Sequence, residues 1–165
     1  RLLGPLIAMN SNGIVVSRMM EEQEISLLAQ DTGLMVVRLP GKYTAVGNLI
    51  AVNDNGALVS SLLPKDCIDA VRKTLDVHVE PMAIASYSQI GVMIAPTNGG
   101  AIIHPAASER EIDQVSSILN VKVTVATVNK GVPFVSSGIV ANSKSLIVGS
   151  LTSGPELAML SQAFE

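Results

Sequence analysis

The sequence predicts an α/β fold made of four copies of one strand-and-helix unit, arranged as a ring or an array. The first observation is an apolar run that begins at four isoleucines spaced 43, 44 and 45 residues apart: Ile7, Ile50, Ile94 and Ile139. The second is a polar turn after each run, followed by another apolar run. A period in this range indicates a unit that buries its apolar face only by stacking on its neighbours.

The chain length fits one domain. A chain of 165 residues buries about 70% of its unfolded surface in a single domain, so no second domain is required. We expect one domain over residues 1–165, with units of approximately 1–43, 44–87, 88–132 and 133–165.

Each unit is expected to open with a hairpin. In the second unit, Gly47 to Val52 is the first predicted strand and Ala57 to Ser60 is the second. Asn53 to Gly56 forms the turn, because Asn and Gly supply the positive φ that tight hairpins demand. Asn53 is therefore expected at an exposed turn position.

A helix and a closing strand are expected after each hairpin. In the first unit the helix covers approximately Glu21 to Gln30. Capping boxes and first-turn prolines mark the other helix starts: Ser108 with Glu111, Ser153 with Glu156, Pro64, and Pro155. Val71 and Leu75 lie on one apolar stripe. The alternation from Val77 to Glu80 predicts a half-buried closing strand.

The composition excludes several classes of protein. The longest uncharged stretch, 81–108, is interrupted by polar residues and by a Gly-Gly turn, whereas a spanning helix needs about 20 mostly apolar residues. No basic-then-apolar signal peptide begins at Arg1. The net charge is −3, with scattered cations, two Phe, two Tyr and no Trp, which disfavours a DNA or RNA groove. A single cysteine cannot form an internal disulfide, so a reducing compartment is expected.

The residues that could perform catalysis do not form a recognisable set. Cys67 is expected on a helix surface, in the first turn, where the other units carry Glu. His104 follows a strand, and His78 lies on the polar side of another. No metal-ligand spacing, phosphate-binding loop or nucleophile motif is present, so we expect no metal, no cofactor and no enzyme activity.

Several segments together resemble the translation initiation factor six family, the ribosome anti-association factors, in the archaeal form. They are Gly47 to Val59, Thr127 to Gly131, Ile139 to Lys144 and Thr152 to Leu157. The resemblance covers essentially the whole chain. It implies the pentein fold, a β/α propeller of five units around a pseudo-fivefold axis, of which four are found here and the first is missing. It also implies a cytoplasmic protein that binds the large ribosomal subunit and prevents the small subunit from joining it.

The turns offer the best candidate surface for that partner. A propeller displays equivalent turns on one rim, so polar turn residues of successive units are expected to lie together as a ribosome-binding face. This candidate face comprises Asn10, Asn12, Asn53, Asp54, Asn55, Thr97, Asn98, Asn142, Ser143 and Lys144. The expected contact is with a ribosomal protein, with some rRNA contact.

Two other interpretations stay open at this stage. Penteins include guanidino-modifying enzymes that use a Cys nucleophile, for which Cys67 is the one available thiol. Four units in an open ring would also leave two apolar flanks in water, which favours a self-assembling scaffold. We expect the open form over a tighter closed ring, because the near-equal spacings contain no compensating insertion.

Overall fold

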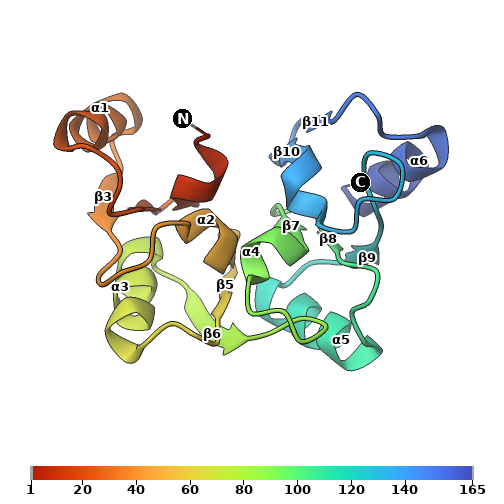
Figure 1. Cartoon of the computed structure of the whole chain (residues 1–165), viewed down its shortest axis with the longest axis horizontal. Coiled ribbons are helices and arrows are strands. Elements are labelled where there is room, and N and C mark those ends of the chain that lie inside the picture. Colours follow the sequence, from red (N-terminus) through yellow and green to blue (C-terminus); the bar gives the residue numbers. More distant parts are fainter. Residues whose placement is uncertain (1, 165) are drawn as a thin grey trace.

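The computed structural model describes residues 2–164, and residues 1 and 165, the outer limits of the expected units, lie outside that range. Four small sheets follow one another around an arc (Figure 1). The first unit and the fourth face each other across an opening, next to the N-terminus in Figure 1. The described residues therefore form an incomplete ring, as expected for the open form.

The first three sheets share one topology. In each, an antiparallel hairpin is followed by a helix and a third strand parallel to the second strand. The strands are β1 Ile7–Met9, β2 Gly13–Val16 and β3 Met35–Arg38; β4 Ile50–Val52, β5 Gly56–Ser60 and β6 His78–Met82; β7 Ile94–Pro96, β8 Ala101–Ile103 and β9 Val123–Val125. The fourth sheet contains only the hairpin β10 Ile139–Ala141 and β11 Leu146–Val148.

One long helix follows each hairpin. These helices are α1 Glu22–Thr32, α3 Lys65–Leu75, α5 Glu109–Leu119 and α6 Gly154–Ala163. Both predicted capping boxes are formed, and a third joins Glu21 to Glu24. Pro155 lies in the first turn of α6 as predicted, whereas Pro64 is the residue just before α3. Each helix after α1 packs on the sheet of the preceding unit: α3 on β2, α5 on β5, and α6 on β8 and β9.

A short helical turn precedes each inner strand. The turns are η1 Gly4–Leu6, α2 Val46–Leu49, α4 Ile90–Met93 and η2 Val135–Gly138, and each packs on the next. The prediction of a strand over Gly47 to Val52 was therefore wrong in its first half. A Cβ on Gly47 would lie 2.0 Å from the Gly4 carbonyl oxygen, so this residue serves close packing of successive turns.

The hairpin glycines serve the same purpose. No residue between Asn53 and Gly56 has a positive φ, so the prediction of left-handed turn residues was wrong. A Cβ on Gly56 would instead lie 2.1 Å from the Ile118 carbonyl oxygen of the next helix. A Cβ on Gly13 would lie 2.1 Å from the Thr74 carbonyl oxygen. Glycine is required here because a helix from the next unit comes into contact with the turn.

Each hydrophobic core joins two units. Ala8 and Val15 of the first unit pack into the core of the second, which includes Val71 and Leu75 of α3. Ala51 and Leu58 then pack into the third core, and Ala95 and Ile102 into the fourth. The first core contains residues of its own unit only. The units are thus held in series by shared cores.

Candidate functional site

Three of the proposed contact residues are buried: Asn10, Asn53 and Thr97. The Asn53 side chain is only 4% exposed, and its amide donates to the Thr97 carbonyl oxygen at 3.1 Å and to the Leu119 carbonyl oxygen at 2.8 Å. Asn10 makes the equivalent bonds, to Asn53 at 3.3 Å and to Leu75 at 2.8 Å. The expectation of exposed positions was wrong, because the next unit covers both asparagine side chains.

The same asparagines also shape their own turns. The Asn53 side-chain oxygen accepts from the backbone of Asn55 and Gly56, both at 3.0 Å. Its amide meanwhile bonds the last carbonyl of the next helix, one of the groups that a helix end leaves unpaired. The Asn55 amide donates to the same Leu119 oxygen at 3.1 Å. Each such turn is therefore fixed to the helix of the following unit; we call this arrangement the asparagine staple.

A second set of turn residues forms a chain on the surface. The Asp54 carboxylate accepts from the backbone and the hydroxyl of Ser11, both at 2.8 Å, and from the Asn98 amide at 2.6 Å. The Asn98 oxygen accepts in turn from the Asp54 backbone at 2.9 Å. These bonds, with the one from the Ser11 backbone foremost, lower the pKa of Asp54. The turns of the first three units are thereby brought together, with Asn12, Asn55 and Asn98 exposed.

The fourth turn has the geometry of a staple without its acceptor. The Asn142 oxygen accepts from Lys144 at 2.8 Å and from Ser145 at 2.9 Å, as in the other turns. Within residues 2–164, the Asn142 amide nitrogen has no hydrogen-bond partner, and Asn142, Ser143 and Lys144 are exposed. These three residues lie at the last turn, apart from the bonded chain of the first three.

The sheet of the fourth unit is also uncovered. Val140 is 72% exposed and Ile147 is 69% exposed. The matching positions in the other units are buried: Ala8, Ala51 and Ala95 on the first strand, and Val15, Leu58 and Ile102 on the second. The difference arises because a following unit covers those pairs and none covers Val140 and Ile147 in residues 2–164.

Cys67 does not have the surroundings of a nucleophile. It is buried rather than on the helix surface, since α3 packs on the preceding unit, and its thiol donates to the Pro40 carbonyl oxygen at 3.2 Å. Burial, with a smaller effect of Asp66, raises the pKa of the thiol. A reactive cysteine needs the opposite shift. Cys67 instead ties its helix to the segment that enters the unit.

The carboxylates at the equivalent position in later units also hold the segment that enters their unit. The sequence analysis missed this role. Glu156 is buried and accepts from Ser153, Thr127, Lys130 and Gly131. These bonds, led by that from the Ser153 backbone, lower its pKa to about 2. Glu111 likewise accepts from Ala85 at 2.9 Å. The capping boxes were visible in the sequence. The second role of the same carboxylates was not visible, because it depends on the entering loop lying beside the helix.

The histidines occupy different surroundings. His78 is exposed on β6, as predicted, and its Nε2 lies 3.5 Å from a Glu80 carboxylate oxygen. His104 is buried, and burial lowers its pKa; its Nδ1 accepts from the Ala106 backbone at 3.0 Å. Across the described part of the chain, no three His, Cys, Asp or Glu side chains gather as a metal site would require.

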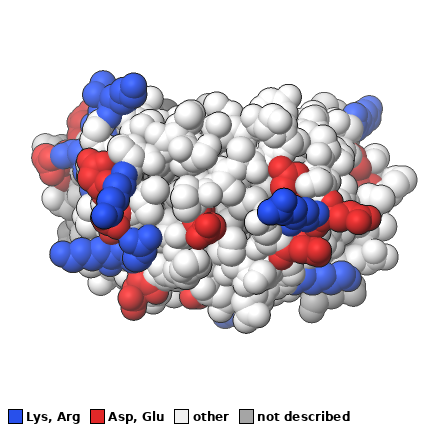
Figure 2. All heavy atoms as spheres, turned by 90° about the horizontal axis from the view of Figure 1, so that it is seen from below, with Lys and Arg blue, Asp and Glu red and all other residues white. Residues whose placement is uncertain are grey.

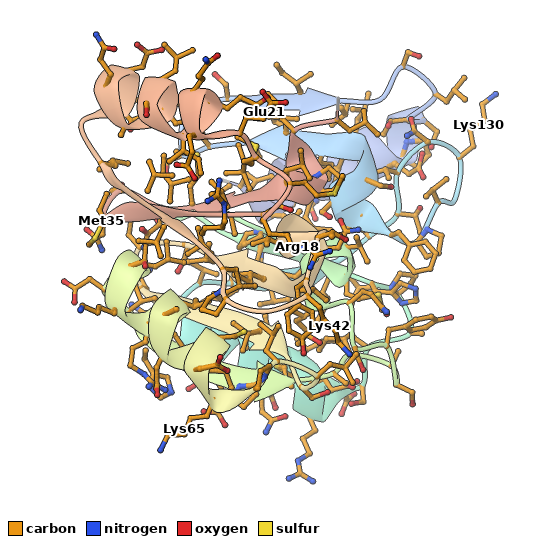
Figure 3. The ribbon with its side chains drawn as sticks, turned by 60° about the vertical axis from the view of Figure 1, so that its left-hand side comes forward. Arg18, Glu21, Met35, Lys42, Lys65 and Lys130 are labelled. Atoms are coloured by element: carbon orange, nitrogen blue, oxygen red, sulfur yellow. The ribbon has the colours of Figure 1, made fainter. Side chains whose placement is uncertain are left out.

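The cations are dispersed. Figure 2 shows Lys and Arg mixed with Asp and Glu toward the two ends of one face, with mostly uncharged surface between them. Figure 3 shows Lys65 and Lys130 projecting from well-separated parts of the molecule. A continuous basic groove is therefore not formed on the face that Figure 2 shows.

Two adjoining hollows lie beside the short helical turns, and the larger one extends along the inner strands. The larger, about 910 Å³, is lined by all four inner strands, and the smaller, about 440 Å³, by Tyr87, Gln89, Val92, Phe134 and Ser137. Val92 and Ser137 belong to both. Every residue that lines either hollow is uncharged.

No helix among residues 2–164 has the length and apolar character needed to cross a membrane.

The comparisons with known proteins agree on one family. The model of the eIF-6 family matches residues 1–163. The chain belongs to the eIF-6 family. Translation initiation factor 6 of Cenarchaeum symbiosum is 42% identical over 164 residues, which is 99% of this chain and 74% of that protein. The factors of Nitrosopumilus maritimus and Pyrococcus abyssi are 42% and 38% identical, with the same coverage. Members of this family are translation factors, and the resemblance to the family found in the sequence is confirmed.

Proposed function

We propose that this eIF-6 family protein binds the large ribosomal subunit and prevents the small subunit from joining it. The observation that carries the proposal is the family match over nearly the whole chain, together with relatives named as translation initiation factors. The activity requires no chemical step. It needs a rigid surface that occupies part of the large subunit at the place where the small subunit docks.

The units supply that rigidity. Shared cores join successive units, and asparagine staples fix the first two turns to the unit that follows each of them. A preformed surface of this kind loses little conformational entropy on binding. Asn10 and Asn53 would act by positioning the turns, while the exposed residues Asn12, Asn55, Asn98, Ser143 and Lys144 remain candidate contacts.

The partner on the large subunit would be mainly a ribosomal protein, with some rRNA contact. The net charge of −3 and the dispersed cations allow few phosphates to be neutralised. Binding should therefore depend only modestly on salt. Such a factor would act in the cytoplasm, where ribosomal subunits join.

We also propose that the complete architecture is a five-unit pentein ring. The relatives are longer than this chain, which covers 74% of their length. The uncovered pair Val140 and Ile147, and the Asn142 amide without a partner in residues 2–164, are what a following unit covers elsewhere in the molecule. One further unit between the fourth and the first would cover Val140 and Ile147 and would offer the Asn142 amide an acceptor.

Cosedimentation with purified archaeal subunits tests the function. The protein should pellet with large subunits and remain in solution with small ones. Equal pelleting with both subunits, or with neither, would contradict the proposal.

A matched pair of charge reversals tests the turns. Lys144→Glu changes an exposed residue of the candidate face, and Lys65→Glu makes the same change at the start of α3, where Figure 3 shows the side chain projecting from the molecule. If the fourth turn contacts the subunit, only Lys144→Glu should weaken pelleting. An equal effect of the two changes would show that the contact with the subunit does not lie at the fourth turn.

A further inference from the structure

We infer that Asn98 is a site of spontaneous deamidation, and that its conversion to aspartate breaks the hydrogen bonds that join the turns of the second and third units. The reaction changes the covalent structure of the chain and does not depend on what the protein binds. The chain contains three places where glycine follows asparagine: Asn12-Gly13, Asn55-Gly56 and Asn98-Gly99.

A glycine after an asparagine makes this reaction possible at the protein surface. Glycine has no Cβ, so its backbone nitrogen can approach the side-chain amide carbon of the preceding asparagine closely. The nitrogen loses its proton to solvent and forms a new C–N bond to that carbon, and the side-chain nitrogen leaves as ammonia with a proton from solvent. Water then opens the cyclic imide to give aspartate or isoaspartate. The glycine N–H must therefore be accessible to solvent.

The asparagine staples protect the pairs of the first and second turns. Gly56 is buried, and its backbone N–H donates to the Asn53 side-chain oxygen at 3.0 Å. The Asn55 amide donates to the Leu119 carbonyl oxygen at 3.1 Å, so the side chain that would be attacked is also held. The first turn has the same burial and the equivalent bonds. These two pairs can react only when the turn separates from the next helix.

The pair in the third turn lies one position earlier and lacks this protection. Gly99 occupies the exposed position of Asn55 and not the buried position of Gly56. The staple is absent because Thr97 has no amide, and its hydroxyl donates within its own turn at 3.0 Å. The Gly99 backbone N–H donates to that hydroxyl at 3.1 Å. Asn98 is exposed as well, so solvent reaches both reacting residues.

The neighbouring turn holds Asn98 in a way that favours the reaction. The Asp54 backbone N–H donates to the Asn98 side-chain oxygen at 2.9 Å. Negative charge develops on that oxygen when the Gly99 nitrogen attacks. A fixed donor at this distance stabilises the tetrahedral intermediate, as the donors of an oxyanion hole do. The second turn therefore assists the chemistry of the third.

The product carries a charge that disrupts the contact between the two turns. The Asn98 amide nitrogen lies 2.6 Å from an Asp54 carboxylate oxygen. Deamidation puts an oxygen in its place, so a hydrogen bond becomes a contact between two like charges. Ser11 donates to the same carboxylate through its backbone and its hydroxyl, both at 2.8 Å, so Asp54 remains with the first turn and separates from the third. The reaction also adds a negative charge to the candidate ribosome-binding face.

Peptide mapping of aged protein tests the site. The folded protein is incubated at mildly alkaline pH below its melting temperature and is then digested with trypsin, which places the three asparagines in separate peptides, 2–18, 43–65 and 74–110. Conversion at Asn98 should be at least about tenfold faster than at Asn12 and Asn55, because those two react only after local opening. In urea-unfolded protein the three rates should become similar. Equal rates in the folded protein, or slower conversion at Asn98, would overturn the inference.

Gly99→Ala is the matched control for the chemistry. A Cβ at this position would lie 3.8 Å from its nearest neighbours, an ordinary contact, so the fold should be unchanged. The added methyl group hinders attack by the backbone nitrogen, and conversion at Asn98 should fall at least about tenfold. Conversion at the wild-type rate would show that the aspartate does not form by this route, and the inference would be wrong.

A charge exchange measures the consequence separately. Asn98→Asp reproduces the product and should unfold at a lower urea concentration than the wild type. Adding Asp54→Asn to that variant should restore the midpoint, because an amide then faces a carboxylate again. If Asn98→Asp unfolds with the wild type, or if the second change gives no recovery, deamidation does not break the contact between the turns.

Discussion

At the scale of single residues, the asparagine staple is the contact most specific to this architecture. Asn53 and Asn142 occupy the same position in their units and make the same bonds within their turns, but only Asn53 donates to the following unit. Substitution to Asp preserves the side-chain oxygen that shapes the turn and replaces the amide donor with a second oxygen. The two variants therefore differ chiefly in the contact with the next unit.

Asn53→Asp should lower the free energy of unfolding by about 2 kcal/mol or more, because two buried carbonyls lose their donor and face a carboxylate. Asn142→Asp, at an exposed position, should change it by less than about 0.5 kcal/mol. Urea denaturation measures both. Equal shifts of the two midpoints would show that the bonds to the next unit do not stabilise the fold. Asn53→Lys, which the sequence alone would treat as a surface change, should also destabilise the protein.

Glu156 gives a prediction for pH dependence at the same scale. Its pKa falls from 4.5 to about 2 in the folded protein, so the folded state favours the ionised form. A group with a depressed folded pKa contributes stability above its unfolded pKa and loses that contribution as pH falls toward the folded value. The wild type should therefore lose more stability than Glu156→Gln between pH 4.5 and pH 2. Parallel losses in acid denaturation of the two proteins would contradict this role.

At the scale of elements, the contact between a helix and the preceding hairpin depends on a missing side chain. Gly56→Ala would place a Cβ 2.1 Å from the Ile118 carbonyl oxygen, so the helix must move. The expected loss is about 2 kcal/mol, within the range for overpacking. Gly4→Ala is the matched control, since no heavy atom lies within 4 Å of its added Cβ. If both variants unfold at the same denaturant concentration, the close approach is not a constraint on stability.

The sequence predicted the elements better than their contacts. The long helices, their caps and the alternation in β6 were visible as period and residue type, because those signals are local. Gly47 was assigned to a strand, and Asn53 to the surface, because their roles depend on the neighbouring unit. The burial of Cys67 and the second role of Glu111 were hidden for the same reason. What the sequence could not show was how one unit lies on the next.

At the scale of the whole molecule, the uncovered face of the fourth unit should drive association of this chain. Val140 and Ile147 expose side chains at positions that are buried in the other three units. Apolar surface of this kind marks sites of association. Sedimentation coefficients should rise with protein concentration, and the double variant Val140→Ser with Ile147→Ser should reduce the rise. A wild-type coefficient that stays constant over the same range would show that this face does not associate.

The measurement that tests the central claim most directly is subunit joining in a purified system. Archaeal large and small subunits are mixed under ionic conditions that favour association, with and without prior incubation of the large subunits with this protein, and are separated on a sucrose gradient. The account predicts that incubation moves material from joined ribosomes to free subunits, in proportion to the protein found on the large-subunit peak. An unchanged yield of joined ribosomes, with the protein bound to the large subunit, would contradict it.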